Sequence, residues 1–296
     1  MINKHWCQAF FSQELISVTS LTGGKQHQVE LIELADNSKW ICKTLSSQTW
    51  LGKTKDLNLV FTEAVAAKVA TELGITFAAY TIDKNPILTL NKGQQAIIRP
   101  YCEGLVLSRL NAPQALLLGR TLAQIHSRSL PINDGQPFPP IVLTKTKRIP
   151  PWLDRTISQC NRYRLYESDK WVVGHRDLHA GNLVWSDAKT VHLLDWESCG
   201  LIHPFIELIG LAMNCAGVAA SFFDEECFRA TLMGYGPLPK TDALLWKQSF
   251  HSWLLWYSYS LQQGWLDDAA QTLESLELIK NKQADMARLY DELSPS

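Results

Sequence analysis

The sequence predicts an α+β protein of two lobes, a small β-rich lobe over residues 1–99 and a larger helical lobe over residues 100–296. Short β-prone runs separated by polar turns make up most of the first hundred residues. The pattern changes after Arg99-Pro100, and from Pro204 onward the sequence has a helical character. Because ligands favour the crevice between two lobes, we expect the functional site there.

The first lobe is predicted to contain a hairpin, a helix and two further strands. Residues 29–34 and 39–45 are apolar, β-prone runs separated by Ala-Asp-Asn-Ser, which favours a turn. Residues 61–73 have a helical pattern that ends at a glycine. Two more strands are predicted at 78–82 and 95–99.

The second lobe is predicted to begin with an amphipathic helix at 113–129, whose leucines form the apolar side. A proline-rich surface connection over residues 131–151 follows. Brief strands are predicted at 171–173, 182–185 and 191–194, and helices account for the rest.

The composition is that of a soluble globular protein. The chain is 46% hydrophobic and 19% charged, and its net charge of −1 indicates neither a nucleic-acid partner nor an anionic membrane surface. The most apolar stretch, 204–220, contains Glu207 and Asn214 and is predicted to be a buried helix, with no membrane span. Seven scattered cysteines and an amino terminus without a signal-peptide core predict a cytoplasmic protein with free thiols.

The most informative stretch is GHRDLHAGNL at residues 174–183, followed by LLDWE at 193–197. Phosphoryl transfer needs one acid to orient the acceptor hydroxyl or take its proton, and a second acid and an amide oxygen to hold Mg²⁺. Asp177, Asn182 and Asp195 supply these groups. The Asp-x-x-x-x-Asn spacing is that of a catalytic loop, and the short strands after Asn182 would return Asp195 beside it as a hairpin.

These three residues also have a simpler interpretation, because Asp and Asn are common in turns and at strand ends. His175 before the aspartate, Gly181 beside the asparagine and the apolar strand that ends at Asp195 favour the functional interpretation.

HRDLHAGNLVW followed by LLDWE resembles the signature of the aminoglycoside phosphotransferase and choline kinase superfamily, the small-molecule relatives of protein kinases. Within it, HAGNLVW, DWE-x-x-G and the aromatic carboxy-terminal helix are most similar to bacterial thiamine kinases and choline/ethanolamine kinases. The resemblance extends from about Leu21 to the end, with dense motifs only in the second half. It implies a protein-kinase-like fold with a nucleotide-binding first lobe, a catalytic and acceptor-binding second lobe, and the use of ATP and Mg²⁺.

The resemblance assigns roles by position. Asp177 corresponds to the catalytic base, and Asn182 and Asp195 correspond to the metal ligands. Lys43, on the second strand of the hairpin, corresponds to the lysine that contacts the α- and β-phosphates, although a strand lysine usually faces solvent. Glu63 is its expected ion-pair partner.

Glu63 has a second explanation and a rival. The helix dipole by itself favours an acid in a first turn. Glu72 is the other acid of this helix, but it falls near the helix end and is expected to point elsewhere.

Two further segments are expected to contact the nucleotide. Gly23 and Gly24 lie between strand candidates, where glycine backbone approaches phosphates closely, although such a pair is often a plain turn. Adenine is expected to bind backbone groups near Arg99, Tyr101 and Cys102, on the basis of position in the fold.

Four residues of the motif region have open roles. His175 and Arg176 are expected to brace the catalytic loop by hydrogen bonds. His179 would contact the γ-phosphate or the acceptor, and Glu197 would face the acceptor or lie in an exposed turn.

The acceptor is expected to bind the helical lobe, with Trp253 and Tyr257 as candidate contacts. They lie on a stripe with Trp246 and Phe250. Three more aromatic residues lie beside it: Trp256, Tyr259 and Trp265. Such stripes are often core, but aromatic faces also attract cations. From residue 221 onward 11 acids face only 6 lysines and arginines, which favours a cationic acceptor or reflects solvated helix faces.

The sequence therefore predicts an ATP-dependent kinase for a small cationic metabolite of the thiamine or choline/ethanolamine type. An aminoglycoside or macrolide antibiotic phosphotransferase is the alternative, and a nucleotide-binding pseudokinase is the second. A protein kinase is disfavoured because neither DFG nor APE follows Asp195. No particular oligomeric state is predicted.

Overall fold

The structure is a computed structural model that describes residues 2–22, 24–90, 93–143, 149–162 and 171–294. The chain forms two compact units, Met1–Glu103 and Gly104–Ser296. The sequence indicated a boundary between residues 99 and 100. Among the described residues, no helix is long and apolar enough to cross a membrane. All seven cysteines are free thiols, and six of them are buried.

Unit 1 is built on a five-stranded antiparallel sheet with the order β1-β2-β3-β7-β6. Its strands are β1 (Leu15–Leu21), β2 (Gln28–Leu34), β3 (Lys39–Thr44), β6 (Leu88–Thr89) and β7 (Gln95–Pro100). The predicted hairpin is confirmed as β2 and β3. A separate two-stranded ribbon contains β4 (Gln48–Thr49) and β5 (Gly52–Lys53).

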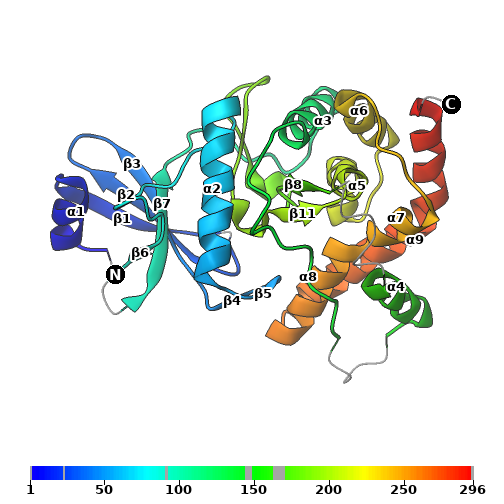
Figure 1. Ribbon diagram of the computed structural model, residues 1–296, viewed down its shortest axis with the longest axis horizontal. Coiled ribbons are helices and arrows are strands. Elements are labelled where there is room, and N and C mark those ends of the chain that lie inside the picture. The colour runs from blue at the N-terminus through cyan, green and yellow to red at the C-terminus, as the bar shows by residue number, and fades with distance from the viewer. Residues whose placement is uncertain (1, 23, 91–92, 144–148, 163–170, 295–296) are drawn as a thin grey trace. The chain divides into compact units, whose positions relative to one another are not determined.

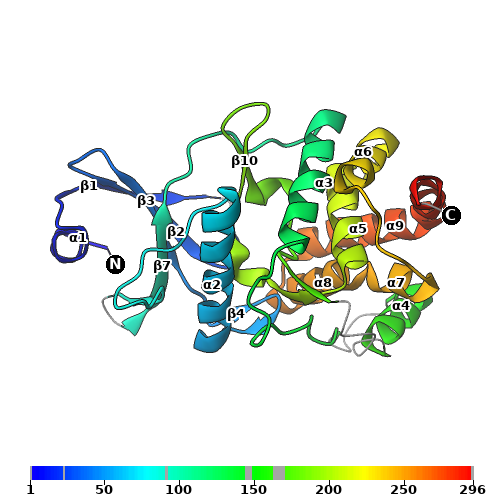
Figure 2. The ribbon, with the colours of Figure 1, turned by 45° about the horizontal axis from the view of Figure 1, so that its top comes forward.

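Two helices cover the faces of this sheet. Helix α1 (Lys4–Phe11) buries Cys7 against the face that carries Ile32 and Ile98. Helix α2 (Asp56–Leu73) packs Leu59 on Ile97, which points to the other face. Figures 1 and 2 show the sheet between the two helices.

Two sequence-based predictions for unit 1 need correction. Residues 78–82 do not form a strand, because within this stretch only Ile82 makes an isolated bridge, to Asn85. Tyr80 instead donates its backbone N–H to Ile98 O at 2.7 Å and packs its ring against Phe10 at a tilted angle, so these β-prone residues pack on the sheet without extending it. Helix α2 begins five residues before the predicted position, and α1 was not predicted.

Unit 2 contains two small antiparallel ribbons at its centre. Strands β8 (Val172–Gly174) and β11 (Gly200–Ile202) form one, and β9 (Leu183–Trp185) and β10 (Val191–Leu193) form the other. The three predicted strands are confirmed, and each predicted end lies no more than one residue from the observed end. Strand β11 was missed because it has three residues and exists only through its pairing with β8.

Helices make up the rest of unit 2. They are α3 (Ala112–His126), α4 (Pro151–Arg162), α5 (Pro204–Cys215), α6 (Glu225–Tyr235), α7 (Ala243–Gln248), α8 (His251–Gln263) and α9 (Leu266–Leu293), with short 3₁₀ turns η3 (Ala180–Asn182), η4 (Trp196–Ser198) and η5 (Val218–Ala220). Helix α4 was not predicted. Helices α3 and α6 lie side by side in Figures 1 and 2 and approach closely at two glycines. A Cβ on Gly119 would lie 2.1 Å from Thr231 O, and one on Gly234 would lie 2.0 Å from Leu116 O.

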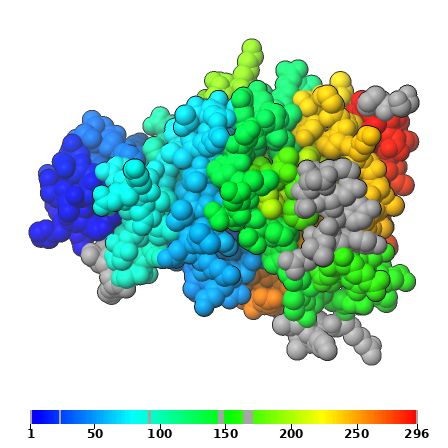
Figure 3. Space-filling model, viewed as in Figure 1, coloured from blue at the N-terminus to red at the C-terminus, as the bar shows by residue number. Residues whose placement is uncertain are grey.

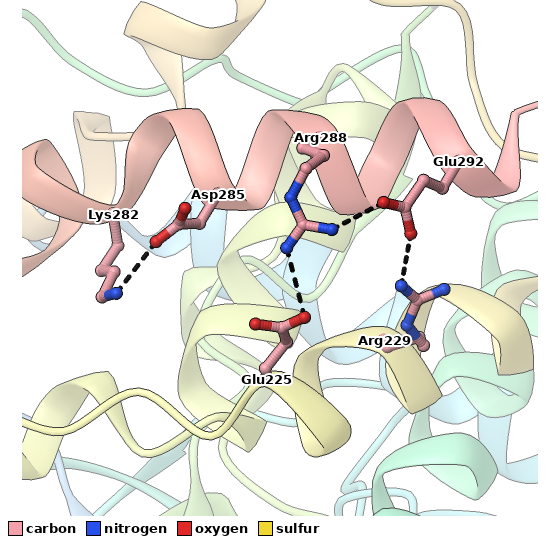
Figure 4. Close-up of polar contacts among 6 residues, drawn as sticks. All are labelled: Glu225, Arg229, Lys282, Asp285, Arg288 and Glu292. Atoms are coloured by element: carbon pink, nitrogen blue, oxygen red, sulfur yellow. Dashed lines mark hydrogen bonds and ion pairs between the residues drawn. The ribbon is translucent and has the colours of Figure 1, made fainter.

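Ion pairs on the surface join α6 to the carboxy-terminal end of α9, which lie side by side in Figure 3. Arg288 pairs with Glu292 at 2.6 Å and with Glu225 at 3.3 Å, and Arg229 also pairs with Glu292 (Figure 4). These side chains are exposed, and exposed pairs contribute little to stability. Part of the acidic excess in this region is therefore engaged in surface ion pairs.

Candidate active site

The residues of the predicted catalytic motif lie in one excursion of the chain, residues 175–199, which we call the motif segment. It leaves strand β8 and returns at strand β11. Gly174 and Gly200 are directly paired in this antiparallel ribbon, so the two ends of the segment are held together.

Asp177 and Asn182 meet at the start of the motif segment. The Asn182 Nδ2 donates to the Asp177 backbone oxygen at 2.9 Å and approaches the Asp177 Oδ2 at 3.4 Å. The turn η3 sets this geometry, and its N-terminal residue His179 accepts the Gly181 N–H through Nδ1 at 3.1 Å. The five-residue spacing therefore places the amide directly against the aspartate.

The hairpin of β9 and β10 brings Asp195 back to the same place. The Leu194 N–H donates to the Asn182 backbone oxygen at 2.8 Å, one residue before Asp195. Asp195 itself has a left-handed backbone conformation, with φ of 60°, that turns the chain into η4. The structure thus brings Asp177, Asn182 and Asp195 together, in the arrangement that the sequence predicted.

Asp177 lies in a mostly protein environment, although its side chain keeps 30% of its surface exposed. Desolvation raises the pKa of its carboxyl group. The nearby His179 opposes this rise, and the negative charge of Asp195 adds to it. The His179 Nε2 lies 3.8 Å from the Asp177 Oδ1, so His179 is placed next to the candidate base.

The chemistry of these groups fits Mg²⁺. The described residues contain no group of three or more His, Cys, Asp or Glu side chains that would hold a metal by themselves. Magnesium, however, binds one or two carboxylates and takes its other ligands from water and phosphates. Because the Asn182 amide nitrogen is engaged with Asp177, its amide oxygen is the atom that a cation would bind, together with the Asp195 carboxylate.

His175 and Arg176 brace the motif segment. The buried His175 ring bonds to the Leu194 backbone oxygen through Nε2 at 2.8 Å and packs on Trp196 with ring centroids 4.6 Å apart. Burial lowers the pKa of His175, so the neutral form is favoured. Arg176 donates through Nε to Ser198 O at 2.6 Å, and Gly200 leaves room for its guanidinium group, since a Cβ there would lie 2.7 Å from the Arg176 Cζ.

Glu207 also contacts this segment. The sequence alone did not separate this contact from a role as a helix-capping residue, because an acid at the start of an apolar helix can have either role. Its Oε1 accepts the Arg176 backbone N–H at 2.6 Å, and its Oε2 bonds to the His126 Nε2 at 2.8 Å. Burial acts to raise the Glu207 pKa, but the contacts with His126 and Arg176 outweigh it and the pKa is lowered. An acid that interrupts the most apolar stretch of the chain was the signal for this role.

In unit 1, Lys43 lies on the sheet face that α2 covers. It is directly opposite Val29 on β2 and Ile97 on β7, and side chains of directly opposed residues share a face. Since Ile97 packs on Leu59 of α2, Lys43 points to the α2 side. Its contact with phosphates stays a prediction.

Glu63 of α2 has a partner that the sequence did not indicate. Only 3% of its side chain is exposed, and it pairs with the Arg99 Nη2 at 2.5 Å. Arg99 also donates to Phe77 O at 2.6 Å. Glu72, the rival acid, pairs with Lys68 at 3.6 Å along the helix surface.

The two remaining nucleotide segments are partly described. Gly23 lies outside the described residues, and Gly24 lies in the loop between β1 and β2. The same loop is anchored by Gln26, whose Oε1 accepts the Trp50 N–H at 2.8 Å. Tyr101 donates its N–H to Lys39 O at 2.9 Å beyond the end of β7, and Cys102 is partly exposed.

The aromatic residues near the carboxy terminus divide into two groups. On the predicted stripe, Phe250 is 2% exposed and Trp246 packs on Phe205 with ring centroids 4.9 Å apart, which is core packing. Of the two candidate acceptor contacts, Tyr257 is 6% exposed and Trp253 is partly exposed. Their role in acceptor binding stays a prediction.

The second group is Trp256, Tyr259 and Trp265, which we call the aromatic cluster. Its ring centroids are 5.9 Å apart for Trp256 and Tyr259, 6.1 Å for Trp256 and Trp265, and 5.5 Å for Tyr259 and Trp265. Both tryptophans are partly exposed. Burial raises the Tyr259 pKa, and the charge of Glu197 adds to that rise.

Glu197 lies close in sequence to the candidate metal ligand Asp195. It is the central residue of η4, is partly buried, and follows Asp195 by two positions. The Glu197 carboxylate, in the same segment as the candidate base, therefore acts electrostatically on one ring of the aromatic cluster, that of Tyr259.

Comparison with known proteins agrees with this geometry. The model of the phosphotransferase enzyme family (APH) matches residues 87–244, which is more than half of the chain. No match was found among curated protein sequences.

Several solved structures are similar along nearly the whole chain. Spectinomycin phosphotransferase in complex with ADP and spectinomycin has a TM-score of 0.67 at 14% identity, covering 99% of this chain and 94% of that one. A choline kinase from Streptococcus pneumoniae has a TM-score of 0.63 at 15% identity, covering 94% and 97%. An ethanolamine kinase from Plasmodium vivax has a TM-score of 0.62 at 15% identity, covering 94% and 83%. The predicted two-lobed, kinase-like α+β fold is confirmed.

Proposed function

Because this chain belongs to the phosphotransferase enzyme family of aminoglycoside phosphotransferases and choline kinases, we propose that it transfers the γ-phosphoryl group of ATP to a hydroxyl of a small cationic metabolite of the thiamine or choline/ethanolamine type. One observation carries this proposal. The β9–β10 hairpin joins Asp195 to the Asp177–Asn182 turn, so the proposed base and the two proposed metal ligands lie in one segment.

Each of these residues has a defined task in the reaction. Asp177 orients the acceptor hydroxyl and accepts its proton as the oxygen forms a bond to the γ-phosphorus, while the bond to the departing ADP breaks. Asn182 and Asp195 would hold Mg²⁺, which would supply positive charge to neutralise the phosphates. His179, beside the Asp177 carboxylate, contacts the γ-phosphate or the acceptor.

Unit 1 supplies the proposed nucleotide contacts. Lys43 contacts the α- and β-phosphates, and the buried Glu63 is the proposed ion-pair partner of Lys43. The loop with Gly23 and Gly24 covers the phosphates, and the backbone near residues 99–103 binds adenine. What supports these assignments is the strand position of Lys43 and the resemblance to the family.

The aromatic cluster and Glu197 are the proposed acceptor site. A cation near aromatic faces gains about 0.5–2 kcal/mol, depending on its desolvation. The Glu197 carboxylate adds a negative charge, which would attract a cation and which also acts on Tyr259. Trp253 and Tyr257 remain candidates, because Trp253 is partly exposed like the two tryptophans of the cluster and Tyr257 is as buried as Tyr259.

An antibiotic phosphotransferase is the second candidate, since spectinomycin phosphotransferase and a macrolide phosphotransferase are among the similar structures. The aromatic cluster favours a compact organic cation, whereas a polycationic aminoglycoside would need several carboxylates. A nucleotide-binding pseudokinase is the third candidate. It is disfavoured because Asp177, Asn182, Asp195 and Lys43 are all present.

A substrate screen tests the proposal. The enzyme is incubated with ATP, Mg²⁺ and single acceptors (thiamine, choline, ethanolamine, kanamycin, spectinomycin and a macrolide), and product mass is measured. We expect a mass gain of one phosphoryl group on an acceptor of the first three. Phosphorylation of an antibiotic only would replace the proposal with the second candidate, and nucleotide binding without any transfer would favour the third.

The charge of the acceptor is tested separately with a matched pair. If choline is the acceptor, 3,3-dimethyl-1-butanol has the same shape and hydroxyl but no charge. We expect kcat/KM to fall at least about tenfold for the neutral compound, as the loss of a cation–π and carboxylate contact requires. Equal kcat/KM for both compounds would show that the site does not select for charge.

The location proposed for this enzyme is the cytoplasm. Its seven cysteines are all free, which suits a reducing compartment.

A further inference from the structure

Two adjacent side chains attach the loop between β1 and β2 to the part of the chain that follows β3. The Gln26 Oε1 accepts the Trp50 N–H at 2.8 Å, and the His27 Nδ1 accepts the Ser46 N–H at 2.9 Å. Both donors are backbone groups of residues 45–54, which we call the ribbon segment because it contains β4 and β5. The carboxy-terminal end of the loop is therefore held by a segment 19 to 24 residues further along the chain.

The ribbon segment is itself fixed at both ends. The Leu45 N–H donates to Gln95 O at 2.8 Å, which joins the start of the segment to β7 of the central sheet. The Thr54 hydroxyl donates to Ser46 O at 2.7 Å, so the last residue of the segment closes on the second. Trp50, in the turn between β4 and β5, is only 6% exposed. These contacts make the ribbon segment a firm support for the loop.

The two bonds require acceptor atoms at defined positions. A backbone N–H only donates, so the His27 Nδ1 carries no proton in this bond and acts as the acceptor. Gln26 uses its amide oxygen in the same way. A side chain of similar size without an acceptor atom would keep the bulk and lose the bond. Each contact can therefore be removed with little change in packing.

The anchored end of the loop lies close to Lys43 in the register of the sheet. Val29 follows His27 by two residues and is directly opposite Lys43 on β3. The ribbon segment begins two residues after Lys43 along the chain. The bonds of Gln26 and His27 thus connect the glycine loop to the end of the strand that contains the proposed phosphate lysine.

Polar anchors matter in this loop because its glycine is held only by ordinary packing. Gly24 is exposed, and a Cβ on it would have His27 O and a Val29 methyl group at 3.7 Å. Glycine loses more conformational freedom than any other residue when it is ordered. A loop that is already in place does not incur this cost when a ligand binds. Backbone N–H groups of an ordered loop are suited to phosphate oxygens.

We propose that Gln26 and His27 are positioning residues for the nucleotide, because they fix the glycine loop on the ribbon segment and so preorganise its backbone for the phosphates of ATP. This inference rests on the proposed function and names two residues on which its nucleotide affinity depends. Neither side chain touches the nucleotide in this role. Both act through the backbone of residues 24–27.

Substitutions at the two anchors test the proposal. Gln26→Met and His27→Leu remove the acceptor atoms and keep side chains of similar size. We expect each to raise the KM and the Kd for ATP about 3- to 10-fold, as the loss of one hydrogen bond predicts, with kcat nearly unchanged. His27→Asn, whose amide oxygen can take the place of Nδ1, is expected to recover most of the lost affinity.

A comparison of ATP with adenosine shows whether the lost affinity concerns the phosphates. Calorimetry with these two compounds requires no acceptor. We expect the Kd of Q26M and H27L to rise for ATP and to match wild type for adenosine, which has no phosphate for the loop to bind. An equal rise for adenosine would mean that the two side chains support the fold of unit 1 in general, and the inference would be wrong.

A second readout does not require a ligand. Amide hydrogen exchange across residues 24–28 reports local opening of the anchored end of the loop. We expect faster exchange there for Q26M and H27L, and exchange close to wild type for H27N. Exposed residues of α1 provide matched controls: Gln8→Met and His5→Leu should leave exchange and ATP affinity unchanged.

The outcomes separate this inference from the proposed function. If Q26M and H27L fold and keep either wild-type ATP affinity or wild-type exchange across 24–28, the two residues do not position the loop. If one variant does not fold, the other decides, and failure of both to fold would assign the residues to the stability of unit 1 instead. If the wild-type protein binds ATP but phosphorylates no acceptor, the proposed function fails, while the affinity and exchange data still decide the role of the anchors. A wild-type protein that binds no ATP would overturn both.

Discussion

The motif segment and helix α8 hold their functional side chains by different means. In the motif segment, short directional hydrogen bonds fix the backbone, from Glu207 to Arg176 and from Asn182 to Asp177. In α8, ring packing places Trp256 and Tyr259, with centroid separations near 6 Å. One region is positioned by polar contacts, and the other by packing.

This difference predicts which kinetic constant a substitution in each region should change. Hydrogen-bonded groups depend on atom type and angle, so isosteric substitutions in the motif segment should reduce turnover. Packed rings depend on size and surface, so substitutions in the aromatic cluster should change acceptor affinity and spare the chemical step. The following experiments test this division, from the largest expected effect to the smallest.

Asp177→Ala should produce the largest loss. Without the base, kcat is expected to fall about 100- to 10,000-fold, while ATP binding measured by calorimetry stays close to wild type. Asp187→Ala, an exposed acid in the β9–β10 turn, is the control and should keep its kcat. Unchanged turnover in D177A would remove the central assignment.

Asp195→Asn should act on the metal. We expect the Mg²⁺ concentration needed for half-maximal activity to rise about 10- to 100-fold, in the range that losing a group at a metal site costs. A Mg²⁺ titration of ATP binding measures it. A titration curve that overlays wild type would show that Asp195 is not a ligand.

Trp256→Leu should change the acceptor KM. Losing one cation–π contact predicts an increase of about 3- to 30-fold with a nearly constant kcat. Trp253→Leu is the comparison, because Trp253 is a partly exposed tryptophan of the same helix that lies outside the aromatic cluster. A larger rise in KM for W253L than for W256L would transfer the acceptor site from the aromatic cluster to the stripe.

Arg288→Ala should have the smallest effect. It breaks the exposed pairs with Glu225 and Glu292 (Figure 4), and exposed pairs contribute little to stability. The melting temperature and acceptor kinetics are expected to match wild type within error. A clear change in acceptor KM would mean that the acidic surface of α6 and α9 contributes to acceptor attraction.

Much of the fold was predictable because its elements have local signals. The hairpin of β2 and β3 has β-prone runs around a polar turn, and α3 has a leucine-rich face. The predictions that were wrong or missed concern residues whose structure depends on distant parts of the chain. Residues 78–82 have β-prone side chains but find their partners in the packing of Tyr80, and β11 has three residues that pair only because β8 lies beside them.

The active-site residues show the same contrast. The spacing of Asp177, Asn182 and Asp195 was readable because a turn and a two-stranded hairpin are local structures that a short sequence specifies. The ion pair of Glu63 with Arg99 was not readable, because Arg99 is 36 residues away in sequence and meets it only across the helix–sheet interface.

The sequence by itself determined the reaction class, since residue types at fixed short spacings place a candidate base and candidate metal ligands in one turn and hairpin. The tertiary structure alone decided that Phe250 is buried while Trp256 and Trp265 are partly exposed, and that Glu207 reaches Arg176. The physical reason is range: hydrogen-bonded turns are set by neighbours along the chain, whereas burial and side-chain meetings depend on which helices pack together.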